Sequence, residues 1–531
     1  MEEPGVDTNG ERRADANEDV GRRREREGQQ LSSEAGVAQR SLWRRIFSFP
    51  VMLVGILLTS PFFASLDVQR GGPVMRDPDI WWHMRNAQVL LTTHHFIRQD
   101  LYSFTVAGKP WVNPEWMAEI PYYLGFRWLG ELGLFLVMLL AIELFIVGML
   151  VRCYRRSGEI TSAFLATWIA VLLAAINIGP RTILFGWLCF LVEMFLLEDY
   201  RKGKDRLWLL VPLFALWVNV HGSWVIGFAF FVLYVAAGFA GGTWGSIEAV
   251  RWTAGEKRKL IAVGAASAAA LFLNPYGWRL VVYPFNMLLH QRLNLAVVDE
   301  WRSVNFQSFY GVLVFVLASL MLVFTLLRRR TWALYELLLT LLAVYEGLAH
   351  KRFLFLAGMI VCPILTVELA GLVFAPYDSK KDNKPWLNVV MLAGFVTFAA
   401  LHFPSRTRLH AAETRYFPVK ALPALESDCA DQHVLNRYEW GGYLIWNARN
   451  IPVFLDSRTD IFDYHGVLKD YLEATNLSGS LALLNKYKVG CVLLQPNAEL
   501  IYLLQHEPGW ATRYEDGTAA LMVREPGTMA H

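Results

Sequence analysis

About eleven hydrophobic blocks, most of them long enough to cross a bilayer, constrain what this chain can fold into. They lie near 48–66, 131–151, 160–178, 182–198, 207–220, 223–241, 259–273, 309–327, 332–348, 353–375 and 386–403. Of the 531 residues, 54% are hydrophobic and only 18% are charged, below the soluble-protein average of about 25%. We therefore predict a polytopic α-helical membrane protein.

The basic residues between these blocks indicate how the chain crosses the membrane. They cluster on alternate connections, at 152–156, 201–206, 257–259, 328–330 and 380–384. Because basic residues concentrate in cytoplasmic loops, this pattern predicts a cytoplasmic N-terminus and an external C-terminus. The long loop 67–130 and the chain after residue 403 are then expected outside.

Composition divides the chain into three parts. Residues 1–45 are polar and carry mixed charge, which predicts a disordered cytoplasmic tail. Residues 46–403 form the transmembrane part with its long first external loop. Residues 404–531 have the pattern of a small α/β domain, with strands expected at 433–435, 452–455 and 489–494 and helices near 440–447, 463–475 and 478–486. Cys429 and Cys491 could form a disulfide there, although spacing alone does not establish it.

The first external loop contains a helix start with unusual chemistry. Asp77 can cap a helix, Pro78 suits its first position, and Asp79 suits its first turn. In such a helix Asp79 and His83 share one face with Asn86, beside two tryptophans. Cap residues and an interfacial tryptophan belt would explain the same pattern without catalysis.

A second helix start, Asn113-Pro114-Glu115, follows in the same loop and places Glu115 and Glu119 on one face. Short external turns supply further polar side chains, namely Arg181, His221, Glu300, Lys351 and Arg352. External cations at membrane depth are suited to bind a lipid-linked phosphate, although each of them could instead snorkel to headgroups. Glu143 and Glu193, within hydrophobic blocks, favour a transporter.

Together, topology and motifs resemble the GT-C superfamily of membrane glycosyltransferases, which use polyprenyl-linked sugars. The segment 79–85 (Asp-Ile-Trp-Trp-His-Met-Arg) is similar to the Asp-x-aromatic-aromatic-polar-x-Arg segment of oligosaccharyltransferase catalytic subunits. Residues 438–443 resemble their Trp-Trp-Asp-Tyr-Gly signature, but glycines follow Trp440. The wider pattern of the chain is similar to that of bacterial membrane proteins described as glycosyltransferases. It includes Trp-x-Asn-x-His-Gly at 217–222 and Asn-Pro-Tyr-Gly at 274–277. The resemblance implies that Asp79 contacts the acceptor or a metal.

The leading hypothesis is a glycosyltransferase of the bacterial plasma membrane, with a periplasmic C-terminal domain. It would move a sugar from a polyprenyl-phosphate or -pyrophosphate donor to an acceptor that the sequence does not identify. Asp79, with Asp77 or Glu115, would act as base or hold a divalent cation, and His83 would orient Asp79 or share its proton. Arg181, Lys351 and Arg352 would neutralise the departing phosphate, and His221 and Glu300 would bind substrate. A lipid or solute transporter and a non-catalytic glycan- or lipid-binding assembly factor are the alternatives; membrane lipid is an expected partner and nucleic acid is not.

Overall fold

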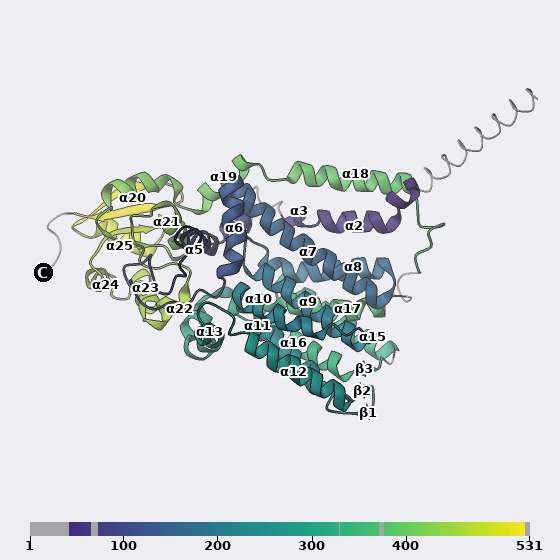
Figure 1. The fold of residues 1–531 in the computed structure, drawn as a ribbon. Helices are drawn as coiled ribbons and strands as arrows, with labels where there is room; N and C mark the ends of the chain where they lie inside the picture. Colours follow the sequence, from purple (N-terminus) through teal and green to yellow (C-terminus); the bar gives the residue numbers. More distant parts are fainter. Residues whose placement is uncertain (1–41, 65–72, 329, 371–375, 526–531) are drawn as a thin grey trace, which may run out of the picture. The chain divides into compact units, whose positions relative to one another are not determined.

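The computed structural model describes residues 42–64, 73–328, 330–370 and 376–525 (Figure 1). The predicted disordered tail therefore lies outside the described residues, apart from its last four. The chain divides into two compact units. One contains the segments up to Thr59 and Pro376–Leu401, and the other contains Ser60–Ala375 and His402–His531.

The smaller unit contains two apolar helices, α2 (Phe49–Thr59) and α18 (Pro385–His402). Asn388 donates a hydrogen bond to the carbonyl oxygen of Phe47 at 2.9 Å. The carbonyl of the Asn383 side chain accepts one from the amide of Phe49 at 2.8 Å. These side-chain amides therefore fix the start of both helices to each other.

The larger unit begins with a succession of helices. They are α3 (Pro61–Ala64), α4 (Pro73–Arg76), α5 (Asp79–Thr93), α6 (Trp116–Leu129), α7 (Glu131–Ser157), α8 (Ile160–Ala174), α9 (Ile183–Arg201), α10 (Leu210–Val220), α11 (Trp224–Ala237), α12 (Ala254–Ala270), α13 (Trp278–His290), α14 (Arg292–Val297), α15 (Phe309–Arg328), α16 (Leu334–Ala349) and α17 (Leu354–Leu369). Almost every residue of α17 is buried, since it packs against α7, α8 and α16. Gly358 faces the backbone of Ala170, so α17 and α8 approach closely, as small residues allow in membrane helices.

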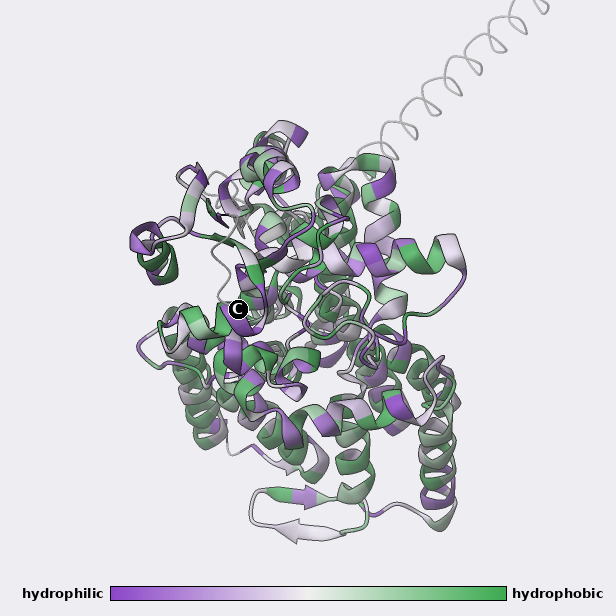
Figure 2. Cartoon of the chain, turned by 90° about the vertical axis from the view of Figure 1, so that its left-hand side faces the viewer, coloured by the Kyte–Doolittle hydropathy of each residue, from purple (hydrophilic) through white to green (hydrophobic). Residues whose placement is uncertain are grey.

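Within the described residues, every predicted hydrophobic block coincides with one or more helices, and hydrophobic residues follow the long helices (Figure 2). A membrane favours this outcome because backbone polar groups must be satisfied within each segment. Among the described residues, five helices are long and apolar enough to span a bilayer. These are Glu131–Ser157, Ile160–Asn177, Phe309–Arg328, Lys351–Leu369 and Pro385–His402. The helical membrane class is thus supported, and the number of crossings stays a prediction.

The C-terminal part contains a four-stranded sheet with the order β4-β5-β7-β6. Its strands are β4 (His433–Asn436), β5 (Val489–Leu494), β6 (Trp510–Glu515) and β7 (Ala520–Arg524), and only the β4–β5 pair is parallel. Its helices are α19 (Arg406–Tyr416), α20 (Leu422–Asp428), α21 (Gly441–Asn447), α22 (Thr459–Tyr464), α23 (Val467–Thr475), α24 (Ser480–Lys486) and α25 (Glu499–His506). Cys429 and Cys491 form a disulfide, which resolves the pairing that the sequence left open.

Two expectations for this part are corrected. Residues 452–455 do not form a strand, because Val453 pairs only through single bridges with Ser103 and Val434. The helix expected over 463–475 is interrupted at Gly466, whose φ of 76° favours glycine and separates α22 from α23.

Helix α5 packs directly against the C-terminal part. Gly442 of α21 lies against the carbonyl oxygen of Pro78, so closely that a side chain there would collide with it. Trp81 is fully buried and meets the rings of Tyr443 and Phe417 edge-on, at 5.0 and 5.5 Å between centroids. The first loop and the C-terminal part therefore form one packed body around α5.

Candidate active site

The start of α5 faces side chains from distant turns. Asp77 accepts a hydrogen bond from the Asp79 amide at 2.9 Å through Oδ1. Helix α5 nevertheless begins at Asp79 with Pro78 in the cap position, one residue later than the sequence predicts. The Oδ2 of Asp77 is bound by the guanidinium of Arg181, which also binds Glu300. Arg181 therefore connects the segment before α5, through Asp77, to the 299–301 turn, through Glu300.

The opposite charges in this cluster change the pKa values of Arg181 and Glu300. Although burial opposes the charge on Arg181, the carboxylates of Asp77 and Glu300 raise the pKa of its guanidinium above the ordinary value. Burial also works against ionised Glu300, but Arg181 and Arg352 lower the pKa of Glu300. Arg181 and Glu300 remain about 30% exposed, at 28% and 31% of their side chains, so a ligand can reach this pair.

Asp79 lies two residues after Asp77, and its pKa is shifted in the opposite direction from that of Glu300. Trp82 directs its indole N–H toward the Oδ1 of Asp79 at 3.4 Å. Desolvation by the surrounding protein, followed by the charge of Asp77, raises the pKa of Asp79 to about 7. A carboxyl group poised near neutral pH can accept or donate a proton, as a general base requires.

Behind Asp79 lies a buried network of histidines and glutamates. His83 points Nδ1 at Glu119 at 2.9 Å and Nε2 at Glu115 at 3.3 Å. Burial disfavours an imidazolium, but the bond to Glu119 and the charges of Glu119 and Glu115 outweigh it and raise the pKa of His83. Both ring nitrogens of His83 therefore face carboxyl groups. Its partners are thus the two glutamates, whereas the sequence suggested that it would orient Asp79.

His221 is the neutral counterpart on the other side of Glu115. Its Nδ1 accepts the amide of Ser223 at 3.0 Å, so the proton of the neutral ring sits on Nε2, which faces Glu115 at 3.3 Å. Burial lowers the pKa of His221 to about 4. Burial would raise the pKa of Glu115, but His221, His83 and a hydrogen bond from Thr182 at 2.6 Å lower it. Glu115 is therefore an ionised acceptor held from three directions.

Lys351 and Arg352, which are adjacent in the 350–352 turn, contact different partners. Lys351 turns to Asp299, with 2.7 Å between Nζ and Oδ2. The guanidinium of Arg352 stacks on Trp301, 4.4 Å from the ring centroid, and its charge acts on Glu300, Arg181 and Asp79. Among the described residues, its buried Nε lacks a hydrogen-bonding partner. The structure therefore brings Arg352 to the cluster and Lys351 to its edge.

The Asp77–Asp79 pair does not offer a chelating site for a divalent cation. Both oxygens of Asp77 are engaged, by the Asp79 amide and by Arg181. In the described part of the chain, the group of three closely spaced ligand residues is instead Glu131, His410 and Glu413. We therefore assign no step to a metal.

The sequence predicts Glu119 on one face with Glu115 but assigns it no role in the site. It is fully buried and accepts from Asn86 at 3.1 Å and from Asn113 at 2.9 Å. Two further residues of the site escaped prediction from sequence. Ser457 and Asp460 arrive from the C-terminal part, bonded to the indoles of Trp82 at 3.0 Å and Trp111 at 3.1 Å. No local pattern connects residues so far apart in sequence.

The intramembrane acids lie apart from this network. Glu193 is completely buried in α9, and in the described residues neither of its carboxylate oxygens has a hydrogen-bonding partner. The Oε2 of Glu143 in α7 is likewise buried without one. No chain of hydrogen bonds therefore joins these two acids in the part of the molecule that is described.

Comparison with known proteins identifies the fold. The chain is similar to the crystal structure of ArnT from Cupriavidus metallidurans bound to undecaprenyl phosphate, with a TM-score of 0.51 and 12% sequence identity. The match covers 91% of this chain and 99% of that one. No protein-family model and no curated protein sequence matches the chain. At this identity the likeness concerns the fold alone, and it agrees with the fold that topology and motifs together predict.

Proposed function

We propose that this protein is a glycosyltransferase that moves a sugar from a polyprenyl-phosphate or -pyrophosphate donor to an acceptor at the periplasmic face of a bacterial plasma membrane. One observation carries the proposal: Asp79, whose pKa lies near 7, shares a partly accessible site with the cation Arg181. A base and a phosphate-binding group are the two requirements of such a transfer.

The fold comparison supports the choice of donor. ArnT, whose fold this chain shares, was crystallised with undecaprenyl phosphate. Predicted topology adds to this support, because it places Arg181 and Arg352 on the outer side of the membrane, where basic residues are otherwise uncommon. A lipid-linked phosphate is the anion expected at that level.

The residues of the site have separate roles in this transfer. As the acceptor attacks the anomeric carbon, Asp79 takes the proton of its hydroxyl group. The bond from that carbon to the phosphate oxygen breaks, and Arg181 and Arg352 stabilise the charge on the departing phosphate. Since both ring nitrogens of His83 face glutamates, this residue keeps the site rigid and does not relay the proton.

The proposal is tested by product release. The purified protein, reconstituted into liposomes, is incubated with a panel of polyprenyl-phosphate and polyprenyl-pyrophosphate sugars and a mixture of acceptor glycans. We expect free polyprenyl phosphate or pyrophosphate, detected by mass spectrometry, with at least one donor and not in empty liposomes. Failure with every donor, together with solute or lipid flux that Glu193→Gln abolishes, would identify a transporter instead.

Glu300 gives a second, quantitative test, because its carboxylate occupies the side of Arg181 that a phosphate would bind. We expect Glu300→Gln to lower the dissociation constant for undecaprenyl phosphate in detergent micelles about five-fold, which corresponds to about 1 kcal/mol. Isothermal titration calorimetry measures this change.

The neighbouring variant Asp299→Asn is the matched control, because Asp299 pairs with Lys351 at the edge of the site. It should leave the dissociation constant within a factor of two. Weaker binding by Glu300→Gln would mean that Glu300 contacts the ligand directly, in the substrate-binding role expected from sequence.

A further inference from the structure

Three side chains with metal-binding groups meet where α19 packs against α7 (Figure 1). Glu131 is the first residue of α7, and His410 and Glu413 lie one turn apart on α19. One ligand atom from each of the three lies within 4.8 Å of the others, and Nδ1 of His410 is 3.1 Å from Oε2 of Glu413. The ligand atoms of a tetrahedral Zn²⁺, each about 2.1 Å from the ion, are about 3.4 Å apart. Small side-chain rotations would therefore let all three bind one ion.

The charges at this contact favour a cation between the two glutamates. Glu413 is only 6% exposed, whereas the side chain of His410 is 61% exposed. Burial, with a smaller contribution from the charge of Glu131, raises the pKa of Glu413, although His410 opposes this shift. Among the described residues, no lysine or arginine forms an ion pair with either glutamate. The two carboxyl groups thus share one exposed imidazole, and a divalent cation would neutralise both of them.

Local effects explain part of this arrangement without a metal. The helix dipole favours Glu131 in the first turn of α7, and His410 and Glu413 are spaced as a helical i, i+3 pair. Neither effect accounts for the approach of Glu131 to a pair on a different helix. The convergence of an imidazole and two carboxyl groups from separate elements is typical of a metal site.

The set of ligand groups indicates the class of metal. One imidazole and two carboxylates suit Zn²⁺ and related divalent transition metals, whereas Ca²⁺ and Mg²⁺ prefer oxygen ligands throughout. Three protein ligands leave a fourth position of a tetrahedral ion to water.

Helix α19 connects this contact to the elements around α5. The ring of Tyr416 lies 4.7 Å from the guanidinium of Arg76 in α4, and the carbonyl of Tyr416 accepts the indole N–H of Trp440 at 2.8 Å. Phe417, the next residue, meets Trp81 of α5 edge-on. An ion that joined α19 to α7 would therefore also restrain the end of α19 that packs against α5.

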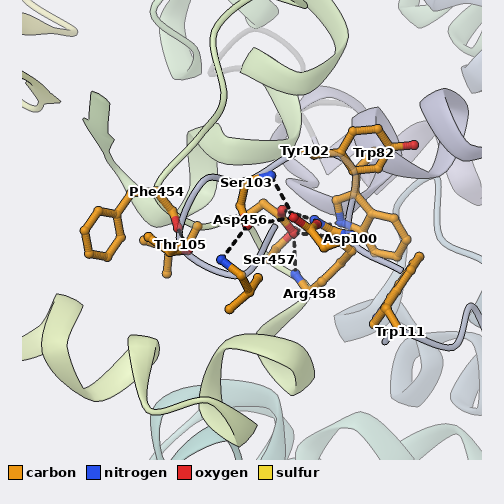
Figure 3. A network of polar contacts seen from close by, with 12 residues as sticks. Trp82, Asp100, Tyr102, Ser103, Thr105, Trp111, Phe454, Asp456, Ser457 and Arg458 are labelled. Atoms are coloured by element: carbon orange, nitrogen blue, oxygen red, sulfur yellow. Dashed lines mark hydrogen bonds and ion pairs between the residues drawn. The ribbon is translucent and has the colours of Figure 1, made fainter. Parts of the chain in front are cut away.

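A separate attachment holds the C-terminal part to the first loop. The Arg458 guanidinium donates to Asp456 and to Asp100 of that loop, each at 2.6 Å, and all three side chains are fully buried (Figure 3). The same guanidinium lies 5.0 Å from the ring centroid of Tyr102 and 4.8 Å from that of Trp111. At the contact between α7 and α19, the corresponding charged groups are the two glutamates and His410.

We propose that Glu131, His410 and Glu413 bind a divalent transition metal ion, with Zn²⁺ as the type case, and that this ion joins α19 to the start of α7. The site is separate from the candidate active site. The proposal does not depend on the proposed sugar transfer.

Metal binding is measured without substrate. The full-length protein, purified in detergent without a histidine tag and stripped of metal, is titrated with Zn²⁺ by isothermal titration calorimetry and with Co²⁺ by visible absorption spectroscopy. We expect His410→Gln and Glu131→Gln each to weaken Zn²⁺ binding at least about ten-fold, since loss of a residue that only supports a ligand already costs about 10–100-fold. Both side chains are at least partly exposed, so these variants should fold.

His506→Gln is the matched control. His506 is an exposed histidine of the same part, and its Nδ1 is bonded to the carbonyl of Tyr502 at 2.8 Å. This variant should bind Zn²⁺ and Co²⁺ as the wild type does.

Thermal unfolding provides a second measurement. An ion bound only by the folded state stabilises it, so Zn²⁺ at about 100 times its dissociation constant should raise the unfolding midpoint of the wild type by about 3–5 °C. The rise should be lost in His410→Gln and Glu131→Gln and kept in His506→Gln. Equal Zn²⁺ affinity in all four proteins, or no binding by the wild type, would overturn the proposal. Neither result bears on sugar transfer, which is tested by release of polyprenyl phosphate.

Discussion

Asp79→Asn should lower the rate of sugar transfer by about 10²–10⁴-fold, the typical contribution of a positioned general base. The amide keeps the size of the side chain and can still accept from the Trp82 indole, so packing at the start of α5 is preserved. It cannot accept the proton of the acceptor hydroxyl. Steady-state kinetics with the active donor measures the loss.

The pH profile of the wild type gives an independent view of the same group. The base must be ionised, and the pKa of Asp79 is raised to about 7. The rate should therefore increase as pH rises toward 7 and level off above it, and Asp79→Asn should remove this dependence. Asp205→Asn, on an exposed carboxylate paired with Lys259, is the control and should retain full activity. Full activity in Asp79→Asn would contradict the assignment.

Arg458→Met should lower the free energy of unfolding by about 3–5 kcal/mol, because it leaves Asp100 and Asp456 buried without their cation. Unfolding in detergent, followed by tryptophan fluorescence, measures the change. Arg437→Met removes a cation of the same part from a partly exposed pair with Glu439, and should cost no more than about 1 kcal/mol.

A third variant separates charge from packing. The combined change Asp100→Asn, Asp456→Asn and Arg458→Met removes all three charges, so it should recover much of the loss caused by Arg458→Met alone. If Arg458→Met is as stable as Arg437→Met, the buried ion pairs of Arg458 with Asp100 and Asp456 do not anchor the C-terminal part.

Sequence predicted the helices well because a membrane leaves few alternatives for a long apolar segment. Within the C-terminal part, β5 covers the range expected for it, but β6 and β7 were not predicted. The error at 452–455 has a clear cause. Its apolar pattern is that of a strand, yet its backbone is divided between single bridges to Ser103 and to Val434.

The candidate site was predictable where local rules act. The helix start at 77–79 and the shared face of Glu115 and Glu119 follow from residue spacing, and the structure brings both together with Arg181. Lys351 and Arg352 show the limit of such reasoning, because adjacent residues of one turn point to different partners. Ser457 shows another limit, since 375 positions separate it from Trp82.

That separation bears on how the protein is made. Ribosomes add about 5–20 residues each second, so roughly 20–75 s pass between synthesis of Trp82 and of Ser457. During that interval α5 is already translated, while Ser457, whose hydroxyl accepts a hydrogen bond from Trp82 in the first turn of this helix, has not yet been synthesised. The contact between α5 and the segment that contains Ser457 must therefore form late in biogenesis, after the intervening helices have been translated.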